Sequence, residues 1–217
     1  MGRRTGIDGR ELILSAALRL FAEDGIDAVS IRAVNRAAGL GPASVHYHFG
    51  TKEALVDAVV ETYGDSVIES TRQRASGLLG TTEPVSAHQL VTILAGPYLD
   101  LITAQREDGA AWIRLVSYLL QSDPDYVVDQ VSARLIWKAT ARAYPDASPS
   151  TIKRAVRICM TLLASQLARI AANGRRAAAG DIDLLVDFLS GGLDATLRSD
   201  ATDRAVRGSA TSASSAG

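Results

Sequence analysis

Hydrogen-bonding side chains cluster in one short stretch of the chain, residues 39–49, with the sequence GLGPASVHYHF. Ser44, His46, Tyr47 and His48 place hydroxyl and imidazole groups there, next to two glycines and a proline. Such groups can donate to phosphate oxygens and can also pair with the edges of bases. The residue types therefore favour contacts with a nucleic acid.

Positive charge is concentrated in the same region. The net charge of the whole chain is −1, which argues against a generic nucleic-acid binder. However, residues 1–52 hold seven Lys and Arg against five Asp and Glu, and residues 28–52 contain Arg32, Arg36 and Lys52 without any acid. The distribution predicts a small basic surface on a molecule that is otherwise slightly acidic.

Short helices are expected to position these side chains. Residues 9–24 repeat apolar side chains at helical spacing, and Gly25 is a suitable C-terminal stop. Ser30 is a good N-cap for a second helix of about eight residues that ends at Gly39. Pro42 suits the first turn of a third helix, where its missing N–H is no loss.

The third helix is expected to end near Tyr47, and Thr51 is expected to cap a long fourth helix. Isolated helices of about eight residues are not stable in water. Leu40, Val45 and Phe49 are therefore expected to be core residues that hold the short helices against their neighbours. Three short helices with a glycine in the second turn are typical of a helix-turn-helix.

Beyond residue 80 the apolar periodicity predicts long helices and no β-strand. Breaks are expected at 80–84 and 107–109, and Asp123-Pro124 is expected to open a helix that ends near residue 144. The last two helices are expected at 148–172 and 181–198. The predicted fold class is all-α.

The pattern divides the chain into three parts. Residues 1–51 are expected to form an N-terminal helix-turn-helix domain, residues 52–198 a larger helical domain, and residues 199–217, which are small and polar, a disordered tail. The single cysteine, Cys159, excludes an internal disulfide framework and a cysteine-rich metal site. No apolar run approaches the roughly 18 residues of a membrane span, so a cytoplasmic protein is expected.

Residues 17–60 carry a specific combination of features. These are Phe21 followed by Gly25, Ser30 opening a helix, Ala37-Ala38-Gly39-Leu40, Val45-His46-Tyr47-His48-Phe49 and Thr51-Lys52-Glu53-Ala54-Leu55. Together they resemble the TetR family of transcriptional repressors, over about a fifth of the chain. Two departures occur: Gly41-Pro42 stand where the family usually has a hydroxyl and often a basic residue, and His46 stands where Tyr is more usual.

The resemblance implies that the second helix of the helix-turn-helix enters the major groove. Small residues at its start would approach base edges, Ser44 would hydrogen-bond bases, and His46, Tyr47 and His48 would donate to phosphates. The two arginines near the N-terminus would reach DNA on a flexible arm. The expected DNA-binding residues are Arg3, Arg4, Ser30, Arg32, Gly41, Pro42, Ala43, Ser44, His46, Tyr47, His48 and Lys52.

The resemblance also implies a homodimer formed through the last two helices, and an apolar effector pocket enclosed by the middle helices. A small, hydrophobic effector that fits only one spacing of the paired DNA-reading heads would release a repressor from its operator. No cofactor, metal or membrane partner is expected. The candidate pocket residues are Tyr98, Gln105, Trp112, Arg114, Tyr118, Gln121, Trp137, Met160 and Gln166.

Two alternatives remain open, an enzyme and a helical small-molecule-binding protein without DNA activity. Against an enzyme, the sequence has no nucleophile elbow, phosphate-cradling glycine loop or acid pair on one helical face, and no catalytic residue is assigned. His46 and His48 do not suggest a metal site, because two residues apart on a short helix they face different directions. A ligand-binding protein alone leaves the acid-free segment 28–52 unexplained.

Overall fold

Helices account for nearly all of the chain that the computed structural model describes, which comprises residues 8–104, 107–123, 131–172 and 179–214. No strand occurs in these ranges, and the all-α fold is confirmed. The helices are α1 (Gly9–Asp24), α2 (Ile31–Ala37), α3 (Ser44–Phe49), α4 (Lys52–Gly80), α5 (Ala87–Thr103), α6 (Glu107–Ser122), α7 (Val131–Ala143), α8 (Pro149–Ala172) and α9 (Ala179–Ser214).

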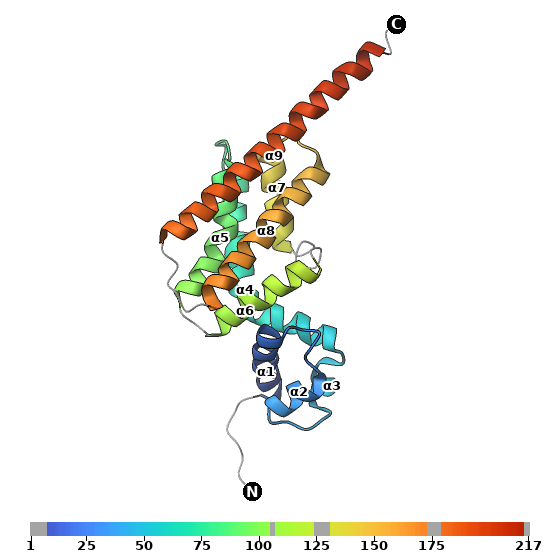
Figure 1. Ribbon diagram of the computed structural model, residues 1–217, viewed down its shortest axis with the longest axis vertical. Coiled ribbons are helices and arrows are strands. Elements are labelled where there is room, and N and C mark those ends of the chain that lie inside the picture. The colour runs from blue at the N-terminus through green and yellow to red at the C-terminus, as the bar shows by residue number, and fades with distance from the viewer. Residues whose placement is uncertain (1–7, 105–106, 124–130, 173–178, 215–217) are drawn as a thin grey trace.

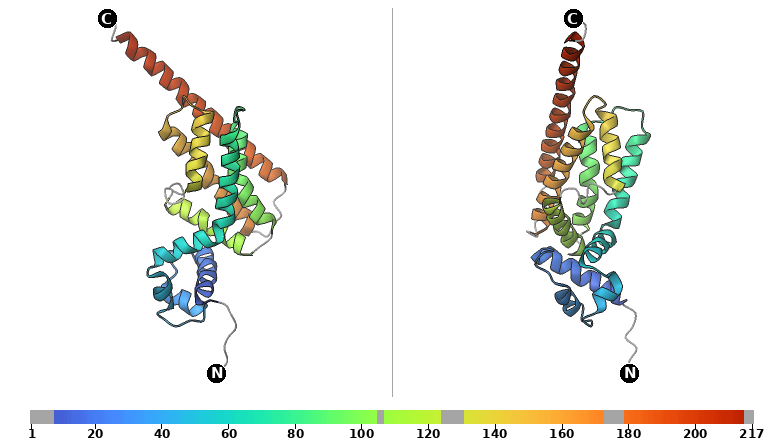
Figure 2. Two further views of the ribbon diagram at one scale, coloured as in Figure 1. Left: turned by 180° about the vertical axis from the view of Figure 1, so that it is seen from behind. Right: turned by 90° about the vertical axis from the view of Figure 1, so that its right-hand side faces the viewer.

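The helices form a small N-terminal group and a larger body (Figure 1). Helices α1, α2 and α3 pack together at one end, and the long α4 leads from this group into the body. Within the body α8 and α9 pack against each other and lie on the side opposite α4 (Figure 2, right). Helix α6 packs on both α1 and α8, so it connects the N-terminal group with the far layer of the body.

The ends of the first helices follow from local capping. Asp8 accepts a hydrogen bond from the amide of Arg10 at the start of α1 (3.2 Å), and Gly25 ends this helix with a φ of +80°, a conformation that glycine adopts without strain. The Ser30 and Thr51 hydroxyls cap α2 and α4. The predicted start and end of α1 and the predicted starts of α2 and α4 are confirmed.

The predicted start and end of the third helix and the predicted break at residues 107–109 are wrong. Helix α3 begins at Ser44 and ends at Phe49, so Pro42 lies in the turn before it. Residues 107–109, expected to be a break, form the first turn of α6. There Asp108 accepts from the next amide, that of Gly109 (2.9 Å), and acidic residues favour a helix N-terminus.

The C-terminal prediction is also wrong, because α9 continues to Ser214 instead of ending at residue 198. Asp200 accepts hydrogen bonds from the Ser148 amide (2.6 Å) and from the Thr151 hydroxyl (2.7 Å) at the start of α8. These contacts across about 50 positions of sequence hold the helix beyond the predicted end. The predicted start of the helix at Asp123-Pro124 lies partly outside the described residues.

Helix α8 is, by length and composition, apolar enough to cross a membrane, and it is the one such helix in the described part of the chain. The sequence-based expectation concerned an uninterrupted apolar run, and α8 is interrupted by Arg157 and Arg169. One side of α8 is buried in the protein core, including Ile152, Val156, Leu163 and Leu167. Core packing is a sufficient reason for the apolar composition of that side.

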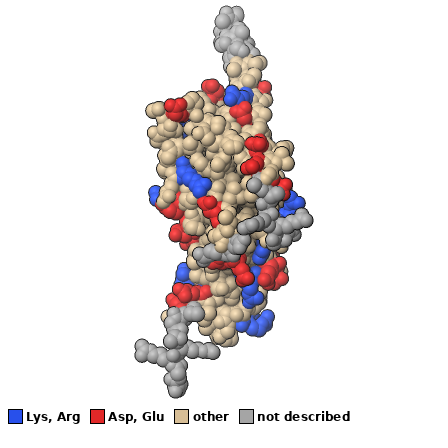
Figure 3. Space-filling model, turned by 90° about the vertical axis from the view of Figure 1, so that its left-hand side faces the viewer, with Lys and Arg blue, Asp and Glu red and all other residues tan. Residues whose placement is uncertain are grey.

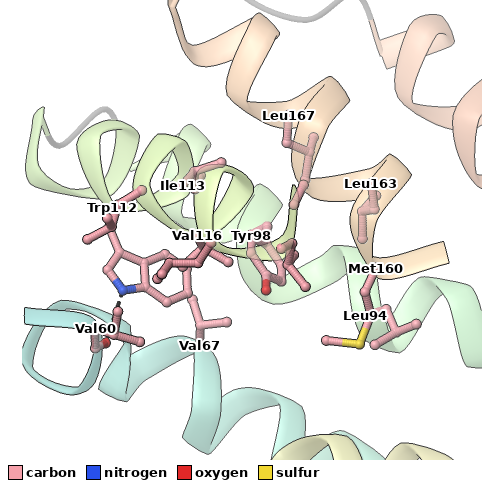
Figure 4. Packing of buried hydrophobic residues seen from close by; sticks show 14 of the residues in the cluster. Val60, Val67, Leu94, Tyr98, Trp112, Ile113, Val116, Met160, Leu163 and Leu167 are labelled. Atoms are coloured by element: carbon pink, nitrogen blue, oxygen red, sulfur yellow. Dashed lines mark hydrogen bonds between the residues drawn. The ribbon is translucent and has the colours of Figure 1, made fainter. Parts of the chain in front are cut away.

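Trp112 links helix α6 to helix α4. Its indole N–H donates to the carbonyl oxygen of Val60 (3.0 Å; Figure 4), and its ring lies against Gly64. A Cβ atom at Gly64 would lie 2.8 Å from Cε2 of Trp112. The absence of a side chain at position 64 therefore allows the close approach of α6 to α4.

We expect Gly64→Ala to lower the free energy of unfolding by about 1–3 kcal/mol, because overpacking against the buried indole outweighs the better helix propensity of alanine. Gly77→Ala is the matched control, since Gly77 lies on the same helix with open space around its Cα. The control should stabilise the chain by up to about 1 kcal/mol. Urea unfolding of both variants measures this, and equal effects would contradict the packing account.

Candidate nucleic-acid interface

Asn35 fixes the angle between α2 and α3. Its side chain is buried, with 2% exposure. The amide group donates to the carbonyl oxygen of Pro42 (2.7 Å), and the side-chain oxygen accepts from the amide of Val45 (3.0 Å). Helix α3 has no side-chain cap of its own at Ala43, so Asn35 supplies from α2 a cap that the local sequence lacks.

The apolar residues of the turn and of α3 face the core, as predicted. Val45 is completely buried, and Leu40 and Phe49 are partly buried against the core. The guanidinium of Arg10 lies over the Phe49 ring, 5.4 Å from its centroid. Gly39 has a φ of +67° in the turn between α2 and α3, so a residue tolerant of the left-handed region is needed there.

The opposite side of α3 faces outward. Tyr47 is 84% exposed, the most exposed of the large hydrophobic side chains among the described residues. His46 is also exposed, and Ser44 is half-buried at the start of the helix. Gly41, Pro42 and Ala43 are exposed in the preceding turn, so the small residues and the ring of Tyr47 share one accessible region.

The two histidines of α3 differ in their surroundings. His46 Nδ1 lies 2.7 Å from the carbonyl oxygen of Gly50. His48 is half-buried, in edge-to-face contact with Tyr47, and its Nε2 lies 3.3 Å from where a Cβ at Gly9 would stand. The His48 ring therefore points partly toward the start of α1, which the sequence pattern did not predict.

The other candidate DNA-binding residues surround α3. Arg32 is exposed and Lys52 is half-exposed. The hydroxyl of Ser30 already accepts from the Ala33 amide (3.2 Å). Arg3 and Arg4 lie outside the described residues. On the face shown in Figure 3, Lys and Arg atoms gather near the end of the molecule that carries the helix-turn-helix, with acidic side chains close by.

The structure brings only some of the candidate effector residues together. Tyr98, Trp112 and Met160 are buried in one apolar region between α4, α5, α6 and α8 (Figure 4). The rings of Tyr98 and Trp112 are 5.7 Å apart, and burial raises the pKa of the Tyr98 hydroxyl to about 12. Among the described residues, no charged side chain is buried, so this region is apolar and uncharged.

The remaining candidates lie elsewhere. Gln121 is exposed and donates to the carbonyl oxygen of Ser117 on its own helix (3.0 Å), and half-buried Gln166 accepts from Arg169 (2.7 Å). Arg114 is half-buried on α6, and Gln105 lies outside the described residues. Trp137 is half-buried, and its indole nitrogen is the one fully buried side-chain N or O atom in the described part that has no hydrogen-bond partner.

Tyr118, expected in the effector pocket, instead joins the body to the N-terminal group. Its hydroxyl donates to Asp27 in the loop between α1 and α2 (2.7 Å), and its ring lies close to Gly25. Trp112 and Tyr118 occupy the same helix, α6. A displacement of α6 would therefore act on α4 through one residue and on the helix-turn-helix through the other.

An exposed apolar surface runs along α8 and α9. Phe188 is 72% exposed, Leu184 is 69% exposed, and Ile158 and Leu162 add to the same helix pair. Phe188, Ile158 and Leu162 border a groove of about 190 Å³ between the two helices. Exposed apolar patches of this kind mark interaction surfaces.

The arrangement of α2, the turn at Gly39 and α3 is that of a helix-turn-helix. Residues 13–59 match the sequence model of the family described as bacterial regulatory proteins, tetR family. The chain is 37% identical over 78 residues to the HTH-type transcriptional repressor KstR2 of Rhodococcus jostii, over 36% of this chain and 35% of that protein. It is 31% identical over 121 residues to the HTH-type transcriptional repressor AcnR of Corynebacterium efficiens, over 55% of each chain.

The fold agrees over a longer stretch. A TetR family transcription regulator from Marinobacter aquaeolei superimposes with a TM-score of 0.60 and 17% identity, over 85% of this chain and 94% of that chain. Residues 13–59 are therefore similar to the N-terminal part of tetR-family regulators, and the fold is similar to that of the Marinobacter protein. The chain spans about half or less of the length of the curated relatives named above.

Proposed function

We propose that this chain is a transcriptional regulator that binds operator DNA as a homodimer through α3 and the turn before it. The observation that carries the proposal is the 84% exposure of Tyr47 on a helix whose inner side is anchored by buried Val45 and by Asn35. A large ring held outward on a rigid, acid-free segment is suited to contact a polyanion. The named relatives are regulators, which favours this proposal over an enzyme.

The contacts divide into two kinds. The turn Gly41–Ala43 and Ser44 would approach base edges in the major groove, since the start of a recognition helix contacts bases. Tyr47 and Lys52 would contact phosphates on either side. Arg32, and Arg3 and Arg4 on the N-terminal arm, would add further backbone contacts.

Dimerisation would proceed through the exposed apolar surface of α8 and α9. One helix-turn-helix with few cations binds DNA weakly and with strong salt dependence. Two linked heads engage two half-sites and gain affinity without new kinds of contact. The groove bordered by Phe188, Ile158 and Leu162 would receive side chains of a second copy.

Regulation would come from a small hydrophobic effector in the apolar region of Tyr98, Trp112 and Met160. No buried charge there would pair with a charged ligand. An effector that moves α6 would shift Tyr118 against Asp27, and with it the helix-turn-helix. Release of a repressor from its operator is the simplest outcome, and such a regulator would act in the cytoplasm.

The experiment begins with selection of a duplex by the purified chain from a random DNA pool, followed by fluorescence anisotropy across a salt series. The affinity should fall steeply with salt concentration. Tyr47→Ala should weaken binding by about 1–3 kcal/mol and leave helicity and dimerisation unchanged. Absence of any selected sequence would favour a helical ligand-binding protein without DNA activity, and an unaltered affinity of the variant would show that α3 binds through another side.

A further inference from the structure

A hydrogen bond to Gly50 fixes the tautomer of the His46 ring. Its Nδ1 lies 2.7 Å from the carbonyl oxygen of Gly50, and a carbonyl oxygen can only accept, so Nδ1 must carry the hydrogen. The Gly50 amide in turn donates to the carbonyl oxygen of His46 (3.0 Å). The two residues therefore bind each other across the turn between α3 and α4, and this holds the imidazole in one tautomer.

The fixed tautomer limits what the ring can offer to DNA. In a neutral imidazole only one nitrogen carries hydrogen, so Nε2 of neutral His46 is an acceptor. Phosphate oxygens also accept, and a neutral ring placed against one would bring two acceptors together. Only the imidazolium form has a donor at Nε2 while it keeps the bond to Gly50.

The position of His46 favours a phosphate over a base as its partner. Bases are contacted mainly by the start of a recognition helix, whereas His46 lies in the last turn of α3. Helices α1, α2 and α4 pack against α3. At their N-terminal ends α1 carries Arg10 and Glu11 and α4 carries Lys52, Glu53 and Asp57, and α2 carries Arg32 and Arg36.

We propose that His46 binds a DNA phosphate as an imidazolium, so that operator binding takes up one proton per subunit at Nε2. The inference rests on the proposed DNA-binding function and concerns the protonation of His46 in the complex with DNA. Because binding takes up a proton, affinity falls as pH rises.

The chain contains two other histidines for comparison, His48 and His88. His48 is half-buried against Tyr47 and close to Gly9. His88 lies on α5 in the body, where it faces Asp187 at 3.7 Å. His88→Gln therefore removes an imidazole from the body and leaves in place the ring that is bonded to Gly50.

The test is fluorescence anisotropy of the full chain with its selected duplex between pH 6 and pH 8.5 at constant ionic strength, with protein in the dimer range. These pH values span the usual titration of histidine, roughly pH 5 to 8. The wild-type chain and His88→Gln should lose affinity as pH rises, by about tenfold per subunit for each unit by which the phosphate raises the pKa of the ring. His46→Gln, whose amide can donate at every pH, should show a flat profile.

His46→Tyr is a second variant, whose hydroxyl donor does not titrate in this range, and it should also give a flat profile. It replaces His46→Gln in the test if circular dichroism shows that His46→Gln does not fold. The proposal is overturned if the wild-type profile is flat, or if the His46 variants keep the wild-type slope. Tight binding of the selected duplex without pH dependence overturns only the proposed proton uptake at His46. Failure to bind any duplex at any pH overturns the DNA-binding function together with it.

Discussion

Asn35→Ala should lower the free energy of unfolding by about 2–4 kcal/mol. The change removes two hydrogen bonds and leaves the Pro42 carbonyl and the Val45 amide without their partner. An unsatisfied buried donor or acceptor costs about 1–3 kcal/mol, more than a hydrogen bond contributes on average. Asparagine also replaces the missing cap of α3, so the variant should loosen this helix in particular.

The expected loss of DNA binding by Asn35→Ala goes beyond the loss of stability. Even at a temperature where the variant is fully folded, α3 no longer has a fixed angle to α2, and operator affinity should fall at least tenfold. Arg36→Ala is the control for stability, because Arg36 is the next residue on α2 and is exposed. Thermal and urea unfolding together with anisotropy measure both effects. A loss of stability no greater than that of Arg36→Ala would show that Asn35 does not position α3.

Phe188→Glu should prevent dimerisation. In the proposed dimer the Phe188 ring, now 72% exposed, would be covered by the second copy, and a buried carboxylate without a partner is strongly unfavourable. Truncation of a central aromatic residue commonly costs 2 kcal/mol or more at an interface. We expect the dimer dissociation constant to rise by at least about thirtyfold, as measured by sedimentation equilibrium.

Operator binding should weaken in the same Phe188→Glu variant, because single heads lose the gain from two linked half-sites. Tyr47→Ala is the matched comparison, since it changes another exposed aromatic residue on the DNA-binding side. It should weaken DNA binding while the dimer stays intact. A Phe188→Glu protein that remains dimeric would place the interface on another surface.

Local features of the sequence predicted the first helices well. Ser30 and Thr51 cap helices through bonds to the amides three positions later, so the signal and its effect lie within one turn. Pro42 misled the prediction for α3, because it also suits the turn in which it lies. Asn35 gave a weak signal, a polar residue beside Val34 on the buried side of α2, and its role was missed.

Contacts between distant segments could not be predicted in the same way. Tyr118 and Asp27 are 91 positions apart, and an aromatic residue in an apolar helix indicates core packing before it indicates a link between domains. Asp200 of α9 binds the start of α8, 52 positions away in the sequence. The local sequence around residue 200 therefore does not predict this contact. The bond from His46 to Gly50 is local, but it depends on the exact direction of the ring.

The most direct test of the central claim, that two copies of α3 bind successive major grooves, is hydroxyl-radical footprinting of the selected duplex. We expect two protected segments on one face of the DNA, separated by one helical turn, about 34–36 Å, or by a multiple of it. Both should disappear with Tyr47→Ala at the same protein concentration. A single protected segment under conditions where the protein is a dimer, or protection that persists in the variant, would contradict the account.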